Sequence, residues 1–245
     1  FGSIAFVADI SFICYQENFK DKALTLAEKY SLKLSSLAAK QPYLYISENP
    51  FIKFKDKEII NSFRSGSFSN RIKNFQRESL LKKAIGYGGE SSQKILDCTA
   101  GLGHDAFILA LLGQYVTFVE KNKGLCILFE LALESLPQTS YFQEAKERIT
   151  IINDDSASFV DKLFDYDVVY IDPMFKDRGT AGRSGVMSLI SDYLDDFTDV
   201  SDVLIGSKFN RMVIKRQKQF KQTGSVSPIF ILSGKSINFH VFISI

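Results

Sequence analysis

The sequence predicts an α/β protein with a mostly parallel, Rossmann-like sheet, preceded by a small N-terminal α+β lobe. From residue 93 on, short apolar runs alternate with segments of helical spacing, which is the pattern of βαβ units. The chain then closes with two apolar runs around Gly234 and Lys235, which indicate an antiparallel hairpin at one sheet edge. A glycine-rich turn at residues 97–103 lies where the first of these strands passes into a helix.

Residues 1–90 are expected to form the N-terminal lobe, because strand and helix patterns are mixed there without regular alternation. The apolar start, Phe1–Tyr15, is interpreted as a first strand or turn rather than a signal segment, since Asp9 interrupts it. The other elements expected in the lobe are a helix over 19–29, two strands over 43–47 and 51–55, and a helix over 70–85.

Residues 91–245 are expected to form the second domain, which carries the parallel sheet. Its expected strands are 94–97, 115–120, 149–153, 167–172 and 211–215. Its expected helices are 104–112, 122–136, 156–163, and one or two helices within 186–204. The closing hairpin is expected over 228–233 and 236–245.

The composition of the 245-residue chain is that of an ordinary globular protein, with 45% hydrophobic and 24% charged residues. A net charge of +2 excludes a polycation, so any contact with nucleic acid must come from local basic patches. Cys14, Cys98 and Cys126 form no CxxC pair, which favours a reduced cytoplasmic protein. No apolar run reaches the roughly 18 residues of a membrane span, and His104 and His240 do not suggest a metal site.

The turn from Asp97 to Gly103 is the first candidate binding feature. Gly101 and Gly103 allow the backbone to turn sharply and to approach a ligand closely. In open α/β sheets, ligands bind outside the carboxyl ends of the strands, where this turn is expected. A structural strand-to-helix turn explains the two glycines about equally well, so this motif alone is weak.

Acidic and hydroxyl side chains follow the next two expected strands. Glu120 ends the second strand, where an acid can accept hydrogen bonds from both ribose hydroxyls of a nucleoside, and Lys121 follows it. Asp155 and Ser156 follow the third strand, where a side-chain acceptor can meet an adenine amino group. Each has a structural alternative: a solvated strand end for Glu120, and a helix N-cap for Asp155 or Ser156.

The fourth strand ends in Asp172-Pro173-Met174-Phe175, which resembles the (Asp/Asn/Ser)-Pro-Pro-(Tyr/Phe) loop of methyltransferases that act on amine nitrogens. The exocyclic amine of a purine is a poor nucleophile, because its lone pair is delocalised into the ring. Asp172 can accept its N–H bonds and hold it near a methyl donor, while Pro173 rigidifies the loop and Phe175 stacks on the base. A proline-containing turn alone would explain only Pro173.

Residues 97–107 and 169–175 together resemble the bacterial ribosomal RNA small subunit methyltransferase J family, from about residue 65 to the end of the chain. The resemblance implies a class I, S-adenosylmethionine-dependent enzyme that methylates the N2 amine of a guanosine in 16S rRNA. It implies that Asp172, Pro173 and Phe175 form the catalytic loop and that the reaction needs no metal. The cofactor contacts that the turn and the resemblance together suggest are Asp97, Gly101, Gly103, His104, Asp105, Glu120, Lys121, Asp155, Ser156 and Asp172.

The sequence departs from that family in three places. The family usually has Arg where His104 stands, which leaves the cofactor contact of His104 open. The alternative for both His104 and Asp105 is a solvated position in the first turn of a helix. The loop 176–183 lacks the family's basic run, and the stretch 71–77 lacks its glycines. Both segments are expected to face RNA, so these departures bear on the target nucleotide more than on the cofactor.

Two basic clusters are candidate phosphate contacts for 16S rRNA or an assembled small ribosomal subunit. The first is Arg64, Arg71, Lys73, Arg77, Lys82 and Lys83, and the second is Lys208, Arg211, Lys215, Arg216, Lys218 and Lys221. The expected RNA contacts are Arg71, Lys73, Arg77, Lys176, Arg178, Lys215 and Arg216. The N-terminal lobe is expected to help recognise RNA. The acidic residues between Asp192 and Asp202 are interpreted as a solvated helix face.

Three other functions stay open at this point. An adenine-N6 or protein side-chain amine methyltransferase would use the same Asp172 loop. A cofactor-binding RNA module without catalysis would have lost Asp172 or the glycine turn, and neither is lost. An NAD-dependent Rossmann enzyme is disfavoured, because the turn lacks the G-x-G-x-x-G pattern.

Overall fold

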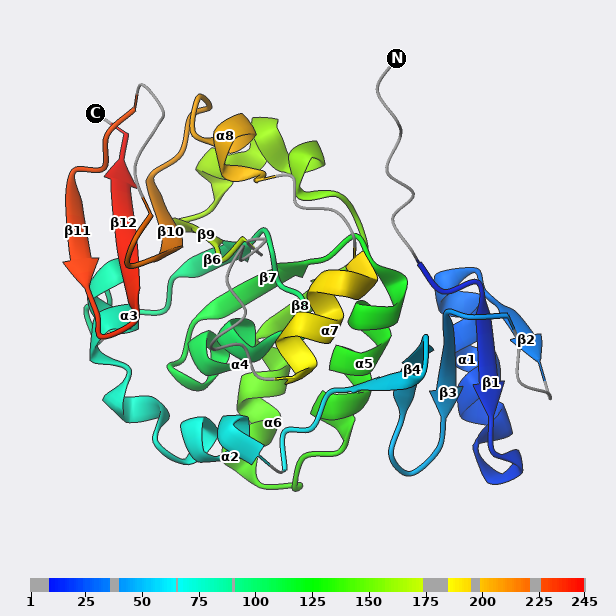
Figure 1. Ribbon diagram of the computed structural model, residues 1–245. Helices are drawn as coiled ribbons and strands as arrows, with labels where there is room; N and C mark the ends of the chain where they lie inside the picture. The colour runs from blue at the N-terminus through cyan, green and yellow to red at the C-terminus, as the bar shows by residue number, and fades with distance from the viewer. Residues whose placement is uncertain are drawn as a thin grey trace, which may run out of the picture. The chain divides into compact units, whose positions relative to one another are not determined.

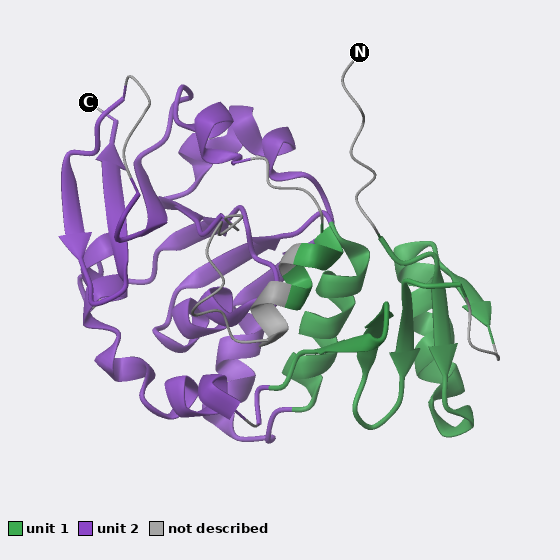
Figure 2. Ribbon diagram, viewed as in Figure 1, with its two compact units in different colours: residues 1–62, 122–135, 174–198 green, residues 63–121, 136–173, 199–245 purple. Residues whose placement is uncertain are grey.

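The computed structural model describes residues 9–35, 40–64, 66–89, 91–173, 185–194, 199–220 and 226–244 (Figure 1). The chain divides into two compact units (Figure 2). Unit 1 contains residues 1–62, 122–135 and 174–198, and unit 2 contains residues 63–121, 136–173 and 199–245. Residues 63–89, which the sequence grouped with the N-terminal lobe, therefore belong to unit 2, where helix α3 (Ser79–Ile85) packs against the large sheet.

Unit 1 has a five-stranded sheet in the order β2-β1-β3-β4-β5. Its strands are β1 (Phe12–Tyr15), β2 (Lys33–Ser35), β3 (Tyr43–Ile46), β4 (Phe51–Phe54) and β5 (Lys57–Ile60). Its helices are α1 (Lys20–Tyr30), α5 (Lys123–Glu134) and α7 (Gly185–Leu194). The expected pairing of residues 43–47 with 51–55 is confirmed as the antiparallel pair β3 and β4, whereas the edge strands β2 and β5 were not foreseen.

Unit 2 has a seven-stranded sheet in the order β11-β12-β10-β9-β6-β7-β8 (Figure 1). Its strands are β6 (Lys94–Asp97), β7 (Tyr115–Val119), β8 (Ile149–Ile152), β9 (Val168–Ile171), β10 (Arg211–Gln217), β11 (Phe230–Ser233) and β12 (Ile237–Ile243). Strands β6 to β10 are parallel, and β12 pairs antiparallel with β10 and β11, as expected. Because β6 lies between β7 and β9, the strand order reverses at β6, which places a ligand crevice at its carboxyl end.

Helical segments of unit 2 cover both faces of this sheet. On one face, the 3₁₀ helix η3 (Ser156–Asp165) and helix α8 (Ser201–Leu204) pack over a buried cluster that includes Leu96, Val169 and Met212. Side chains alternate along a strand, so Tyr170 points to the other face, where its hydroxyl reaches the start of α4 (His104–Leu111). Helix α6 (Ser140–Glu147), which the sequence analysis did not assign, packs beside α4.

The helix expected over residues 70–85 is wrong in its continuity. The structure has α2 (Gly66–Lys73), a 3₁₀ turn over Phe75–Arg77 and then α3. The backbone leaves helical geometry at Asn74, whose side-chain amide donates 2.9 Å to the carbonyl of Asn70, and again at Glu78. Because the helix breaks here, Oε1 of Glu78 lies 2.7 Å from Nε of Arg71. This ion pair is formed in place of the continuous helix that the spacing predicted. Within the ranges given above, no helix combines the length and the apolar character needed to cross a membrane.

Candidate functional site at the carboxyl edge of the large sheet

The glycine turn after β6 has the conformation that its sequence requires. Gly101 and Gly103 have φ values of 55° and 73°, a region that glycine adopts readily and other residues rarely. The Gly101 N–H donates to Oε2 of Glu120 at 2.9 Å, and Gly103 begins helix α4. A side chain at Gly101 would meet nothing closer than 3.9 Å, so the turn leaves open space beside its backbone.

Glu120 lies at the end of β7, next to this turn, and is buried. The side-chain amide of Asn153 donates to the carbonyls of Glu120 and Lys121 at 3.0 and 2.9 Å, which joins the ends of β7 and β8. A carboxylate has about four acceptor positions, so Glu120 can bind both Gly101 and a hydroxyl-bearing ligand. Lys121 is exposed.

One of the residues after β8, Asp155, caps the helix that follows it. Oδ1 of Asp155 accepts the Ala157 N–H at 2.9 Å and begins the 3₁₀ helix η3, so the N-cap alternative is observed for Asp155. Asp155 is nevertheless exposed, and the following Ser156 is buried. Both residues lie at the carboxyl edge of the sheet, where their predicted contact with a cofactor stays a prediction.

Asp172 follows β9 and is tied to the glycine turn. Its backbone N–H donates to Oγ1 of Thr99 at 2.6 Å, and Nζ of Lys215 binds its Oδ2 at 2.6 Å. Pro173 is buried beside it, which is consistent with a rigid loop. Phe175, Lys176 and Arg178 lie outside the described residues.

A buried ionic network continues behind Asp172 on the face that α4 covers. The Asp105 carboxylate accepts from Nη1 of Arg71, from Nζ of Lys215 at 2.9 Å and from the Tyr170 hydroxyl at 2.6 Å. Lys215 therefore bridges two carboxylates, of which Asp105 is 9% exposed and Asp172 is 37% exposed.

Opposing charges decide the protonation states in this network. Burial acts to raise the pKa of Asp105, but Lys215 and Arg71 outweigh burial and hold it well below its ordinary value. Burial acts to lower the pKa of Lys215, but Asp105 and Asp172 raise it above its ordinary value. Burial raises the pKa of Asp172, and Lys215 opposes this rise. The network therefore contains a fixed ion pair, Asp105 with Lys215, next to an acid whose ionisation depends on its neighbours.

Asp97 is buried, and His104 is half-buried. Oδ1 of Asp97 accepts the Thr99 N–H at 3.3 Å, and burial raises the pKa of Asp97 well above its ordinary value. The imidazole of His104 stacks on Phe68 with ring centroids 3.9 Å apart. Burial lowers the pKa of His104 to about 4, so its imidazole is neutral near pH 7.

The structure corrects several expected roles of charged residues. The alternative of solvated first-turn residues is wrong for Asp105, which is buried in the network, and for His104, which is stacked on Phe68. Arg71 and Lys215 are bound by carboxylates beside the candidate site, and their contact with phosphate stays a prediction.

Two further corrections concern Arg216 on β10 and Asp199 before that strand. Arg216 is buried and donates to Asp199 and to the Ser201 hydroxyl, so it is not the exposed phosphate contact that was expected. Asp199 also belongs to this buried pair, although Asp192 and Asp202 are exposed as expected. Lys73 and Arg77 are exposed and keep their predicted role as RNA contacts. Among the described residues, no group of three or more His, Cys, Asp or Glu is placed to hold a metal ion.

Thr99 and Tyr170 are site residues that the sequence analysis did not single out. Thr99 lies in the glycine turn, two residues after Asp97, and Tyr170 lies in β9, two residues before Asp172. Thr99 has a side-chain acceptor inside a ligand turn, which is a signal that could have been used. Tyr170 sits within a continuous apolar run, where a buried tyrosine needs a hydrogen-bond partner that only the fold identifies.

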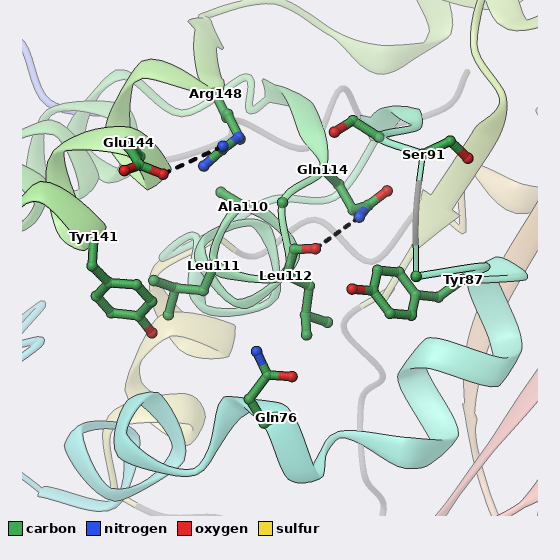
Figure 3. Close-up of a pocket in the computed structure, with 13 residues that line it drawn as sticks. Gln76, Tyr87, Ser91, Ala110, Leu111, Leu112, Gln114, Tyr141, Glu144 and Arg148 are labelled. Atoms are coloured by element: carbon green, nitrogen blue, oxygen red, sulfur yellow. Dashed lines mark hydrogen bonds and ion pairs between the residues drawn. The ribbon is translucent and has the colours of Figure 1, made fainter.

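A pocket of about 290 Å³ lies at the opposite edge of the same sheet, where β6 and β7 begin (Figure 3). The end of α4 at Leu111 and Leu112, with Tyr87 and Tyr141, lines it. The buried Gln114 side chain accepts the Gln93 N–H and donates to the Leu112 carbonyl. Glu144 and Arg148 form an ion pair at 3.6 Å on its rim. None of the residues that line it was predicted to belong to the cofactor site.

Comparison with known proteins identifies the family. Residues 22–244 match a family described as SAM-dependent methyltransferases. The chain is 30% identical to the ribosomal RNA small subunit methyltransferase J of Francisella tularensis subsp. novicida, over 82% of this chain and 86% of that protein. It is 28% identical to the same-named protein of Francisella philomiragia, over 96% and 98% of the two chains. A solved SAM-dependent methyltransferase of Neisseria gonorrhoeae has the same fold, with a TM-score of 0.72, 22% identity and 95% coverage of both chains.

Proposed function

Because this chain belongs to the ribosomal RNA small subunit methyltransferase J family of SAM-dependent methyltransferases, we propose that it methylates the exocyclic N2 amine of a guanosine in 16S rRNA. The observation that carries the proposal is the position of Asp172. Thr99 holds Asp172 against the glycine turn, which supports a site where the proposed acceptor for the amine and the proposed cofactor-binding turn share one edge of the sheet.

The residues present at this edge fit S-adenosylmethionine. The open backbone at Gly101 allows close approach of a ligand, and the buried Glu120 offers acceptors suited to ribose hydroxyls. Asp155 and Ser156 lie where the adenine of the cofactor is expected, and Asp97, His104, Asp105 and Lys121 stay predicted as further or indirect contacts. When bound, the cofactor supplies a methyl group already activated on a sulfonium.

The protein's own contribution to the reaction is orientation. An ionised Asp172 accepts N–H bonds from the guanine amine and directs its nitrogen toward the cofactor. The buried Pro173 restricts the loop, and Phe175 is proposed to stack on the base. A transfer that depends on alignment is sensitive to small displacements, and a misplacement of about 1 Å can cost on the order of 100-fold in rate.

The RNA partner is proposed to be 16S rRNA, either free or within the small ribosomal subunit. Lys73 and Arg77 are exposed on the segment before β6, which suits them to phosphate contact. Lys176 and Arg178 are proposed to bind RNA beside Phe175. Recognition of RNA by the N-terminal lobe is part of the same proposal.

Nucleoside analysis after methyl transfer tests this function. Purified protein, labelled S-adenosylmethionine, and either 16S rRNA or small subunits lacking the modification are expected to yield N2-methylguanosine. Asp172→Asn is expected to keep cofactor affinity by calorimetry and to lower the transfer rate by about 100-fold or more. N6-methyladenosine or a labelled ribosomal protein as the product would replace the guanine-N2 proposal, and cofactor binding without any transfer would indicate a non-catalytic RNA module.

A further inference from the structure

We propose that Lys215 is a positioning residue that holds Asp172 as an ionised and correctly oriented acceptor for the substrate amine. This inference rests on the proposed function and deepens it. The residue lies on β10, the strand next to β9, so its side chain approaches Asp172 from the side opposite β6. The sequence suggested only that Lys215 contacts phosphate, since nothing in β10 marks it as part of the site.

The geometry shows which atoms Lys215 fixes. Its Nζ lies 2.6 Å from Oδ2 of Asp172 and 2.9 Å from Oδ2 of Asp105. Asp105 cannot follow a movement of Lys215, because Tyr170 and Arg71 also hold its carboxylate. The ammonium is therefore anchored on its buried side, and Asp172 is bound to a fixed point.

Asp172 itself is held at two points. Lys215 binds its side chain. Its backbone N–H donates at 2.6 Å to the hydroxyl of Thr99, which lies in the glycine turn. With the backbone and one carboxylate oxygen positioned, the carboxylate plane has little freedom. This arrangement aims the remaining acceptor positions of Asp172 without a direct contact between Lys215 and the substrate.

The charges around Asp172 explain why a cation is needed there. The carboxylates that face this region are Asp97 below the glycine turn, Asp105 on α4, and Glu78 beside Arg71. The cations are Lys215 and Arg71, and Arg71 is already bound by Asp105 and Glu78. Without Lys215, Asp172 would share a crowded site with like charges, which favours its protonated form. A protonated Asp172 would present an O–H and lose part of its capacity to accept hydrogen bonds from the amine.

The key variant is Lys215→Met, which keeps side-chain length and removes the charge. The loss of the cation is expected to raise the lower apparent pKa of the kcat profile by about one pH unit or more. Methyl transfer to small subunits is expected to fall about 10-fold at a pH below the wild-type apparent pKa and to recover as the pH rises above the apparent pKa of the variant. Lys94→Met, which removes an exposed lysine at the amino end of β6, is the matched control and is expected to behave as wild type.

A second comparison separates a positioning role from a general structural one. Adding Lys215→Met to Asp172→Asn is expected to cause little further loss of kcat, because the residue through which Lys215 acts is already neutral. Lys215→Arg keeps the cation and is expected to leave the apparent pKa near its wild-type value, although its different shape lowers kcat. An upward shift in Lys215→Arg as large as that in Lys215→Met would contradict the proposal, and this variant serves if Lys215→Met does not fold.

A readout that needs no substrate completes the experiment. Carboxylate ¹³C NMR of selectively labelled aspartates, with the Asp172 signal assigned by its loss in Asp172→Asn, reports the ionisation of Asp172 directly. In Lys215→Met that signal is expected to titrate at higher pH than in wild type. An unchanged titration, or additive losses of kcat in the double variant, would overturn the role of Lys215. A wild-type protein that methylates no rRNA would overturn the proposed function alone.

Discussion

The two edges of the large sheet contrast in how they are built. At the carboxyl edge, backbone donors and cations hold the carboxylates of Asp105, Glu120 and Asp172. At the amino edge, a pocket of about 290 Å³ is lined mainly by neutral groups, such as Gln114 and Tyr87, with one ion pair on its rim. Among the described residues, the two edges therefore differ in how much charge they concentrate.

This difference in charge follows from what a parallel sheet presents at each of its two edges. In a parallel sheet, the carboxyl ends of strands meet the starts of the following helices, where glycine turns and backbone N–H groups accept ligands. The amino ends receive the ends of helices, whose carbonyl groups need donors such as the Gln114 amide. The two edges therefore respond differently to the same kind of substitution.

The largest contrast is expected between two glycines with positive φ, one at each edge. Gly101 has φ 55° and Gly113 has φ 86°, so valine is strained at both positions and lowers stability by about 1–2 kcal/mol. Gly101→Val also displaces the amide that binds Glu120 and is expected to weaken S-adenosylmethionine binding by about 100-fold or more. Gly113→Val is expected to leave that affinity unchanged. Calorimetric titration and thermal melting of both variants measure the two effects, and equal affinity losses would erase the contrast.

A smaller effect on cofactor affinity is expected from Glu120→Gln. The amide oxygen can still accept the Gly101 N–H, but the charge that strengthens hydrogen bonds from ribose hydroxyls is lost. We expect the dissociation constant for S-adenosylmethionine to rise by about 10- to 100-fold, consistent with the value of a charge-assisted hydrogen bond. The same titration measures it, with circular dichroism as the control for folding. A wild-type affinity would remove Glu120 from the cofactor site.

The start of α4, at the carboxyl edge, is expected to make stability depend on pH through His104. The folded pKa of about 4 lies below the ordinary value of 6.5, so protonation favours the unfolded chain. The stability contribution of His104 is complete above pH 6.5 and is lost as the pH falls through 4. We expect wild type to lose up to about 3 kcal/mol relative to His104→Phe over this window, since phenylalanine can still stack on Phe68. Urea unfolding at pH 7 and pH 4 gives this difference, and a constant difference would contradict the burial of a neutral imidazole.

The smallest effect is expected at the rim of the amino-edge pocket. Glu144→Gln removes an ion pair with Arg148 whose glutamate side chain is 59% exposed. We therefore expect the free energy of unfolding to fall by less than about 0.5 kcal/mol and the rate of methyl transfer to stay unchanged. Rates on small subunits and urea midpoints test this directly. A marked loss of transfer would mean that the amino edge takes part in RNA binding, and the comparison between the edges would need revision.

The regular part of the fold was accessible from local patterns. Buried strands such as Val168–Ile171 are continuous apolar runs, and the glycine turn marks the strand-to-helix transition after Asp97. Where the pattern was ambiguous, long-range contacts decided. The helix expected over 70–85 breaks because Arg71 binds Glu78 and Asp105, and Asp105 lies 34 residues further along the chain. The edge strand β5 begins with Lys57 and Glu58 and has only two apolar residues, so its pairing with β4 rather than its own composition makes it a strand.

The sequence by itself determined the class of site and most of its motif residues: the glycine turn, Glu120, and the Asp172-Pro173 loop. These residues follow β6, β7 and β9, which are neighbours in the sheet, and a parallel sheet brings their carboxyl ends to one edge. Only the tertiary structure decided what Arg71, Lys215 and Arg216 do. A cation has the same local pattern whether it faces RNA, bridges two aspartates or is buried against Asp199, because the choice depends on carboxylates that strand pairing and helix packing bring to it from distant parts of the chain.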